Sequence, residues 1–356
     1  MNELLEFVKM SKYAGERFDL TQAGGGNSSV KLNNGKMLIK ASGYLLSDVE
    51  LEKGYATLNH SQVVEALNNP TFETISNKRE REQYASQLVN ESLISTESRP
   101  SIETFLHSLL YRFTLHTHPV VVNMVTCQKD WEDRLIALFG DQALYVQYET
   151  PGIELAIAMN EKLKAYRTTH TEDPQIVFLQ NHGVIISAST AEEVYTLNEK
   201  VLSILEKSEN VDFSRYRYTN QISSLINQHN NTQYIAYLSE DTQVNQLATH
   251  QKYLEVTPFC PDGYVFCGAK VLVLPKLNYE FMKKYIDSYH DVPKVIVYQS
   301  MVFLIAVNVK KAKEMEEVFK FHLMTIHFAK KEINTLPTDE IKYLGNWEAE
   351  KYRQKL

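Results

Sequence analysis

Residues 99–122 constrain the fold more than any other part of this 356-residue chain. The first apolar residues of the segment recur at helical spacing, which predicts a helix that begins at an N-cap Ser101 and continues to Phe113. The sequence "TLHTHP" that follows has strand spacing, so the side chains of His116 and His118 are expected on one face. A segment this apolar has to be buried, and the fold must therefore accommodate its polar side chains.

Two imidazoles on one face of a strand can bind a single metal ion. A third histidine, His182, lies between two strand-like runs, where Gly183 is expected to give a turn its backbone freedom. Three neutral imidazoles with an open fourth position are typical of a catalytic zinc. The spacing therefore predicts a metal site made of His116, His118 and His182.

Each of these residues also has a simpler interpretation. Histidines in apolar strands often serve only as hydrogen-bonding residues. Four residues before His107, Glu103 could be a first-turn carboxylate that the helix dipole favours. His107 is interpreted as a buried hydrogen-bonding residue close to the site, with the role of ligand as the alternative. Only the combination of residues favours a metal site.

A glycine-rich loop near the N-terminus is a candidate anion site. In "AGGGNSS", residues 23–29, backbone N–H groups, the Asn27 amide and the hydroxyls of Ser28 and Ser29 could wrap an anion, although a plain turn is the alternative. The loop lacks both the Walker pattern and the dinucleotide fingerprint G-x-G-x-x-G. A second small-residue turn, "KASGY" at 40–44, could face the same cavity. The residues expected to hold a phosphate group are Asn27, Ser42, Gly43 and Ser101.

Composition excludes several classes of protein. The chain is 44% hydrophobic and 23% charged, which is typical of a soluble globular protein. Its net charge of −7 does not supply the positive field that nucleic acids or anionic membranes attract. No run approaches the roughly 18 apolar residues of a membrane span, so we expect a cytoplasmic protein. The three cysteines form no C-x-x-C pair and are expected to be reduced.

The length of the chain predicts more than one domain. Helical and strand patterns alternate over residues 1–207, which we interpret as the main domain. Residues 208–250 are rich in Asn, Gln, Ser and Thr and are expected to be a peripheral connecting segment. Residues 251–356 read as a smaller C-terminal α/β subdomain.

Three local patterns add detail to this division. Asn34 and Gly35 predict a hairpin turn between two strands. In the C-terminal part, residues 264–275 have a strand-like pattern, and residues 309–333 have the pattern of a long amphipathic helix.

Six ordered blocks resemble the class II aldolase/adducin family, over roughly residues 5–205. Their form is similar to the aldolase portion of long bacterial proteins described as rhamnulose-1-phosphate aldolase joined to a dehydrogenase. The dehydrogenase portion has no counterpart, so the resemblance implies no nicotinamide cofactor. The six blocks are "GGGNSSVKL", "IKASGYLL", "RPSIETFLHSLL", "LHTHPVVVNMV", "YETPGIELA" and "QNHGVIIS".

The resemblance implies a fold and a site. The fold would be an α/β three-layer sandwich with a mostly antiparallel central sheet, with the C-terminal subdomain appended to it. The family's three metal ligands correspond to His116, His118 and His182, and the metal would be Zn²⁺ or another divalent cation. The family's catalytic glutamate corresponds to Glu103. Its phosphate cradle corresponds to Asn27, Ser42, Gly43 and Ser101.

The implied reaction is cleavage or formation of a C–C bond in a ketose phosphate through a metal-stabilised enediolate, with dihydroxyacetone phosphate and an aldehyde as the fragments. Epimerases, dehydratases and decarboxylases of the family share this chemistry, and a non-catalytic adducin-like scaffold is a further alternative. The group that protonates the aldehyde oxygen stays unassigned, because Tyr145 comes too late to match the family's tyrosine. The expected partners are a small sugar phosphate and further copies of the chain, as in tetrameric relatives.

Overall fold

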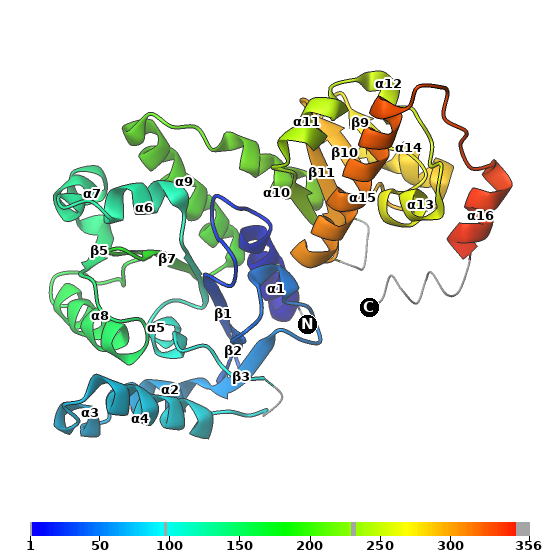
Figure 1. Ribbon diagram of the computed structural model, residues 1–356. Helices are drawn as coiled ribbons and strands as arrows, with labels where there is room; N and C mark the ends of the chain where they lie inside the picture. The colour runs from blue at the N-terminus through cyan, green and yellow to red at the C-terminus, as the bar shows by residue number, and fades with distance from the viewer. Residues whose placement is uncertain (1, 96–97, 229–232, 347–356) are drawn as a thin grey trace. The chain divides into compact units, whose positions relative to one another are not determined.

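The structure is a computed structural model, and it describes residues 2–95, 98–228 and 233–346. The chain divides into two compact units, residues 1–213 and residues 214–356 (Figure 1). The last ten residues of the predicted C-terminal subdomain lie outside the described residues. None of the helices in the described part combines the length and apolar character that a membrane span requires.

The first unit is built around a seven-stranded sheet in the order β3-β2-β1-β4-β7-β6-β5. Five of the neighbouring pairs are antiparallel and the β5–β6 pair is parallel, so the sheet is mixed. Its strands are β1 (Asn27–Lys31), β2 (Lys36–Lys40), β3 (Tyr55–Asn59), β4 (Phe113–Thr117), β5 (Ala143–Val146), β6 (Ile176–Leu179) and β7 (Gly183–Ala188).

Helices cover both faces of this sheet (Figure 1). Alternate strand residues face opposite cores: Leu38 packs in one, whereas Met37 and Ile39 pack in the other. The helices of the first core are α1 (Asn2–Gly15), α6 (Val120–Thr126), α7 (Trp131–Phe139) and α9 (Ala191–Glu209). Those of the second are α2 (His60–Leu67), α3 (Thr71–Thr74), α4 (Lys78–Glu91), α5 (Thr104–Ser108) and α8 (Ile153–Tyr166). Two short 3-10 helices span Leu46–Asp48 and Gly140–Gln142.

The predicted hairpin is confirmed, because β1 and β2 pair in antiparallel register around Gly35, whose φ is +79°. The predicted long helix from Ser101 to Phe113 is wrong. Helix α5 has only five residues, and Phe113 begins β4 and packs in the opposite core from Phe105. Pairing of β4 with two neighbouring strands therefore outweighs the helical pattern of the segment.

The second unit contains a four-stranded sheet in the order β8-β11-β10-β9. The strands are β8 (Ile235–Leu238), β9 (Leu272–Leu274), β10 (Val295–Tyr298) and β11 (Met301–Ala306). The helices are α10 (Ser214–Asn227), α11 (Thr242–Ala248), α12 (Gln251–Leu254), α13 (Pro261–Cys267), α14 (Tyr279–Tyr289), α15 (Val309–Phe328) and α16 (Thr338–Asn346). Helix α15 matches the predicted long helix, although it ends five residues earlier.

The segment 208–250 is not a peripheral connector. It carries α10, β8 and α11, and β8 pairs with β11 in the sheet of the second unit. Ile222 and Ile226 of α10 are almost completely buried. The few apolar residues of α10 are spaced so that they lie on one face of the helix. The high polar content of the segment made this face difficult to recognise in the sequence.

The predicted strand at 264–275 is also only partly present. Residues up to Cys267 form α13, because Pro261 in the first turn favours a helix start. The helix ends at Gly268, whose φ is +79°, and only Leu272–Leu274 form a strand.

The role of α10 in the core predicts the effect of one substitution. Ile222→Ala should lower the free energy of unfolding of the second unit by about 2–5 kcal/mol, because it leaves a cavity in the core. Gln221→Ala, at an exposed position of the same helix, should change it by less than about 0.5 kcal/mol. Urea titrations followed by circular dichroism measure both values, and equal values would contradict the assignment of α10 to the core.

Candidate metal site

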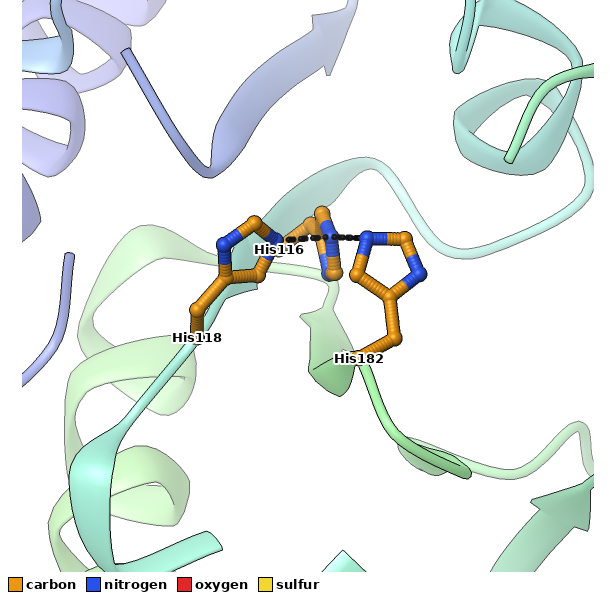
Figure 2. Close-up of side chains that lie close together, drawn as sticks. All are labelled: His116, His118 and His182. Carbon is orange, nitrogen blue, oxygen red and sulfur yellow. Dashed lines mark hydrogen bonds between the residues drawn. The ribbon is translucent and has the colours of Figure 1, made fainter. Parts of the chain in front are cut away.

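The central strand β4 places two of the candidate ligands. His116 lies opposite Asn27 of β1 on one side and opposite Ile185 of β7 on the other. His118 follows directly beyond the end of β4. His182 immediately precedes β7, in the turn that joins it to β6. The antiparallel pairing of β4 and β7 therefore brings the three imidazoles together (Figure 2).

The three imidazole rings converge at their Nε2 atoms. The Nε2 atom of His116 lies 3.0 Å from Nε2 of His118 and 3.3 Å from Nε2 of His182. His116 is completely buried, and the other two side chains are partly exposed. The site is therefore buried at His116 and reaches solvent at His118 and His182.

A hydrogen bond fixes the tautomer of His116. Its Nδ1–H donates to the carbonyl oxygen of Val184 at 3.1 Å, which leaves the lone pair of neutral His116 on Nε2. Nitrogen ligands at about 2.0–2.1 Å from a tetrahedral zinc are about 3.3 Å apart. The observed separations are close to this value, so the three side chains fit a divalent metal ion.

Two of the imidazoles are neutral near pH 7. Burial, with His116 and His182 nearby, lowers the pKa of His118 to about 3. Burial and His116 lower the pKa of His182 to about 4. Neutral imidazole is the form that binds metal ions.

The carboxylate of Glu103 lies beside the converging imidazoles. Its Oε1 atom is 3.3 Å from Nε2 of His116 and 3.6 Å from Nε2 of His182. Burial alone would raise the pKa of Glu103, but attraction to His116 and the neighbouring histidines holds it below its usual range. The same pairing raises the pKa of His116 against the effect of burial. Glu103 is therefore an ionised carboxylate beside three converging nitrogen atoms.

The turn at residues 17–21 holds the backbone of His118. The N–H of His118 donates to the carbonyl oxygen of Leu20, and the N–H of Val120 donates to the backbone carbonyl oxygen of Asp19, each at 2.9 Å. This turn is itself fixed by the buried guanidinium of Arg17, which donates two hydrogen bonds to the Asp19 carboxylate. No sequence pattern indicated this role for Arg17 or Asp19.

The glycine loop makes close contacts with the ligands. A Cβ atom on Gly25 would lie 2.8 Å from Nδ1 of His118, and one on Gly26 would lie 2.9 Å from the carbonyl oxygen of His116. Gly26 also has φ +75°, whereas a Cβ on Gly24 would meet nothing within 4 Å. Gly25 and Gly26 are therefore required where the loop packs against the histidines.

The turn that carries His182 differs from its sequence interpretation. Asn181 takes the left-handed conformation, with φ +53°, and Gly183 does not have a positive φ. A Cβ on Gly183 would lie 2.2 Å from the carbonyl oxygen of Thr117. Gly183 is required by close packing against β4 rather than by the conformation of the turn.

The four residues predicted to hold phosphate are linked by a chain of contacts. The Asn27 amide lies 3.5 Å from the Glu103 carboxylate, and the Glu103 N–H donates to Oγ of Ser101 at 3.2 Å. The Ser42 N–H donates to the carbonyl oxygen of Arg99, which places the turn of Ser42 and Gly43 (φ +87°) beside the same segment. Asn27 and Ser101 therefore lie next to Glu103, and Ser42 lies beside Arg99, four residues before it.

The hydroxyls of Ser28 and Ser29 do not belong to this group. Both are buried; the first bonds with Oγ of Ser11, and the second lies 2.8 Å from Nδ1 of His107. The prediction that they wrap an anion is wrong. His107 is buried and lies outside the group of three converging histidines, as its interpretation as a hydrogen-bonding residue requires.

Comparison with known proteins identifies the family. The sequence model of the family described as "Class II Aldolase and Adducin N-terminal domain" matches residues 6–206, more than half of the chain. The chain belongs to the class II aldolase and adducin family. This confirms the resemblance seen in the sequence. No curated protein matches the chain significantly.

Several solved structures are similar to part of the chain. One is the N-terminal class II aldolase domain of a conserved protein from Thermoplasma acidophilum, with 24% identity and a TM-score of 0.46 over 57% of this chain and 91% of that chain. Another is an L-fuculose-1-phosphate aldolase from Thermus thermophilus, with 17% identity and a TM-score of 0.36 over 58% and 94%. A sugar-phosphate aldolase from Thermotoga maritima has 15% identity and a TM-score of 0.38 over 60% and 98%.

The first prediction for the candidate metal site concerns the ligands. The wild-type protein should bind about one divalent metal ion per chain, and His116→Ala should lose it because only two imidazoles remain. His250→Ala is the control, because His250 is an exposed residue of the second unit. Metal analysis after dialysis against zinc measures the content, and equal retention in all three proteins would contradict the site.

The second prediction concerns the glycine loop. Gly25→Ala should weaken metal binding at least about 10-fold, because the new methyl group displaces the His118 ring. Gly24→Ala places its methyl group in open space and should bind metal like the wild type. Competition with a chromophoric chelator measures both affinities; equal loss in the two variants would show that the loop acts only through general stability.

Proposed function

We propose that the protein is a metal-dependent aldolase that cleaves or forms a C–C bond of a ketose phosphate. The three-carbon fragment is dihydroxyacetone phosphate, the other is an aldehyde, and zinc is the proposed metal. Family membership supports the reaction class. The observation that carries the proposal is the position of the Glu103 carboxylate. Its Oε1 atom lies 3.3 Å from Nε2 of His116, one of the three converging imidazoles.

A bound divalent cation supplies Lewis acidity, which polarises a carbonyl group and makes the neighbouring C–H acidic. Glu103 is placed to move that proton, because it is ionised and lies within reach of a substrate bound at the open side of the histidines. The Asn27 amide beside its second oxygen atom helps to orient the carboxylate. Burial of the carboxylate excludes water from the proton-transfer step.

The proton balance assigns Glu103 one transfer in each direction. In the synthetic direction it takes a proton from C3 of dihydroxyacetone phosphate, and the electron pair left on C3 attacks the aldehyde carbon. In cleavage the C3–C4 bond breaks as the 4-hydroxyl gives up its proton, and C3 receives a proton through Glu103, so the net change is one proton moved from the 4-hydroxyl to C3. The group that exchanges a proton with the aldehyde oxygen is not Tyr145, whose buried hydroxyl donates to the carbonyl oxygen of Gly140 at 2.7 Å.

The phosphate group is proposed to lie beside the 40–44 turn. Ser42 and Gly43 (φ +87°) are exposed in this turn, and a Cβ on Gly43 would meet nothing within 4 Å, so an anion has room to approach the Ser42 hydroxyl. Ser101 lies two residues before the proposed base, so a bound phosphate would fix the distance from C3 to Glu103. The residues proposed to bind it are Asn27, Ser42, Gly43 and Ser101. A homo-oligomer stays a prediction from the family.

The proposal predicts loss of C–H exchange in Glu103→Gln. Wild-type protein with zinc should exchange one C3 hydrogen of dihydroxyacetone phosphate for deuterium in D₂O. Glu103→Gln should exchange it at least about 100-fold more slowly, because the amide cannot accept the proton. Proton NMR measures the rate, and metal analysis checks that the variant keeps its metal.

Glu154→Gln is the matched control, since Glu154 is another shielded glutamate but pairs with Arg81 rather than with a histidine. It should exchange at the wild-type rate. Metal binding without exchange in the wild type would contradict the proposed substrate and favour an epimerase, dehydratase or decarboxylase, which product analysis separates. Absence of both metal and exchange would favour a non-catalytic scaffold.

A further inference from the structure

One short helix connects the two chain segments that carry the candidate ligands. Helix α6 begins at Val120, two residues after His118. On its first turn, the Asn123 amide donates to the carbonyl oxygen of His182 at 3.2 Å, across 59 positions of sequence. The two ligands are thus tied to the same few residues of one helix.

A second hydrogen bond joins the same helix to the same turn. The N–H of Asn181 donates to the carbonyl oxygen of Thr126 at 3.2 Å, near the end of α6. Asn181 is in the left-handed conformation with φ +53°, which costs energy for a residue with a side chain. Such a turn keeps its shape only when its neighbours hold it.

The Asn123 side chain is itself oriented. Its Oδ1 atom accepts a hydrogen bond from Oγ1 of the completely buried Thr126 at 3.2 Å. This contact leaves the NH₂ group to face the His182 carbonyl oxygen. Both polar atoms of the Asn123 amide are therefore hydrogen-bonded, the oxygen atom to Thr126 and the nitrogen atom to the backbone of His182.

We propose that Asn123 is a positioning residue for the metal: it fixes His182 relative to His118 by holding the backbone of the 180–183 turn on α6. The inference rests on the proposed function, in which these histidines bind the metal. Ligand nitrogen atoms must converge within a few tenths of an ångström to bind a small cation tightly, so a turn free to shift lowers metal affinity. Asn123 touches neither metal nor substrate in this role.

Asn123→Ala and Gln128→Ala form a matched pair of variants. Both remove an amide that donates to a backbone carbonyl oxygen, but the Gln128 amide donates to Met124, at an exposed position near the end of α6. Asn123→Ala should bind zinc about 3- to 10-fold more weakly in chelator competition, the range expected for loss of one neutral hydrogen bond. Gln128→Ala should bind it like the wild type.

Hydrogen exchange of the metal-free proteins gives a readout that does not depend on the metal. Amides of residues 180–184 should exchange several-fold faster in Asn123→Ala than in the wild type or in Gln128→Ala. Asn123→Leu, which keeps the branched shape of the side chain without its hydrogen-bonding groups, should behave like Asn123→Ala and replaces it if that variant does not fold.

Unchanged zinc affinity with unchanged exchange in both Asn123 variants would overturn the inference. Equal losses in Gln128→Ala would overturn it as well, since the effect would then be one of general helix stability. If the wild type takes up no metal, the proposed function fails, and the exchange rates alone decide whether Asn123 holds the turn.

Discussion

Pairing of β4 with strands on both of its sides is the constraint on which the rest of the site depends. This strand lies at the centre of the seven-stranded sheet, with β1 on one side and β7 on the other. The register places His116 opposite Asn27, whose amide meets Glu103, and brings the turn before β7 to the same edge. A shift of one residue would turn His116 to the other face of the sheet. The backbone ladder therefore fixes the convergence of the side chains.

The convergence of these side chains has an energetic cost that a bound cation would remove. Three imidazole nitrogen atoms and one carboxylate meet in a largely buried place, where lone pairs without a donor or a cation are unfavourable. A divalent metal ion bound here would give the three nitrogen atoms a common partner and would balance the charge of the carboxylate. It would also tie together α5, β4 and the 180–183 turn. The proposed metal site thus predicts that a bound metal ion would stabilise the first unit.

Much of the site could be predicted from local sequence, and most of its support could not. The strand spacing of His116 and His118 and the Asn34–Gly35 turn depend on backbone periodicity and turn chemistry, which a sequence displays directly. The observed length of α5, by contrast, depends on the pairing of β4 with its neighbouring strands. That of α13 depends on the helix start at Pro261 and the helix end at Gly268. The hydrogen bond from Asn123 to His182 spans 59 positions, so no local pattern indicates it. The sequence shows that positions 25 and 183 are glycines but not why. The nearest atoms that a Cβ would meet there belong to His118 and Thr117, which are distant in sequence.

X-ray absorption spectroscopy of the zinc-loaded protein tests the central claim most directly, because it measures the atoms bound to the metal. The account predicts three nitrogen ligands at about 2.0–2.1 Å, with the scattering pattern of imidazole rings. A first shell that contains only oxygen atoms, or sulfur at about 2.3 Å, would contradict it. In that case His116, His118 and His182 would not be the metal ligands.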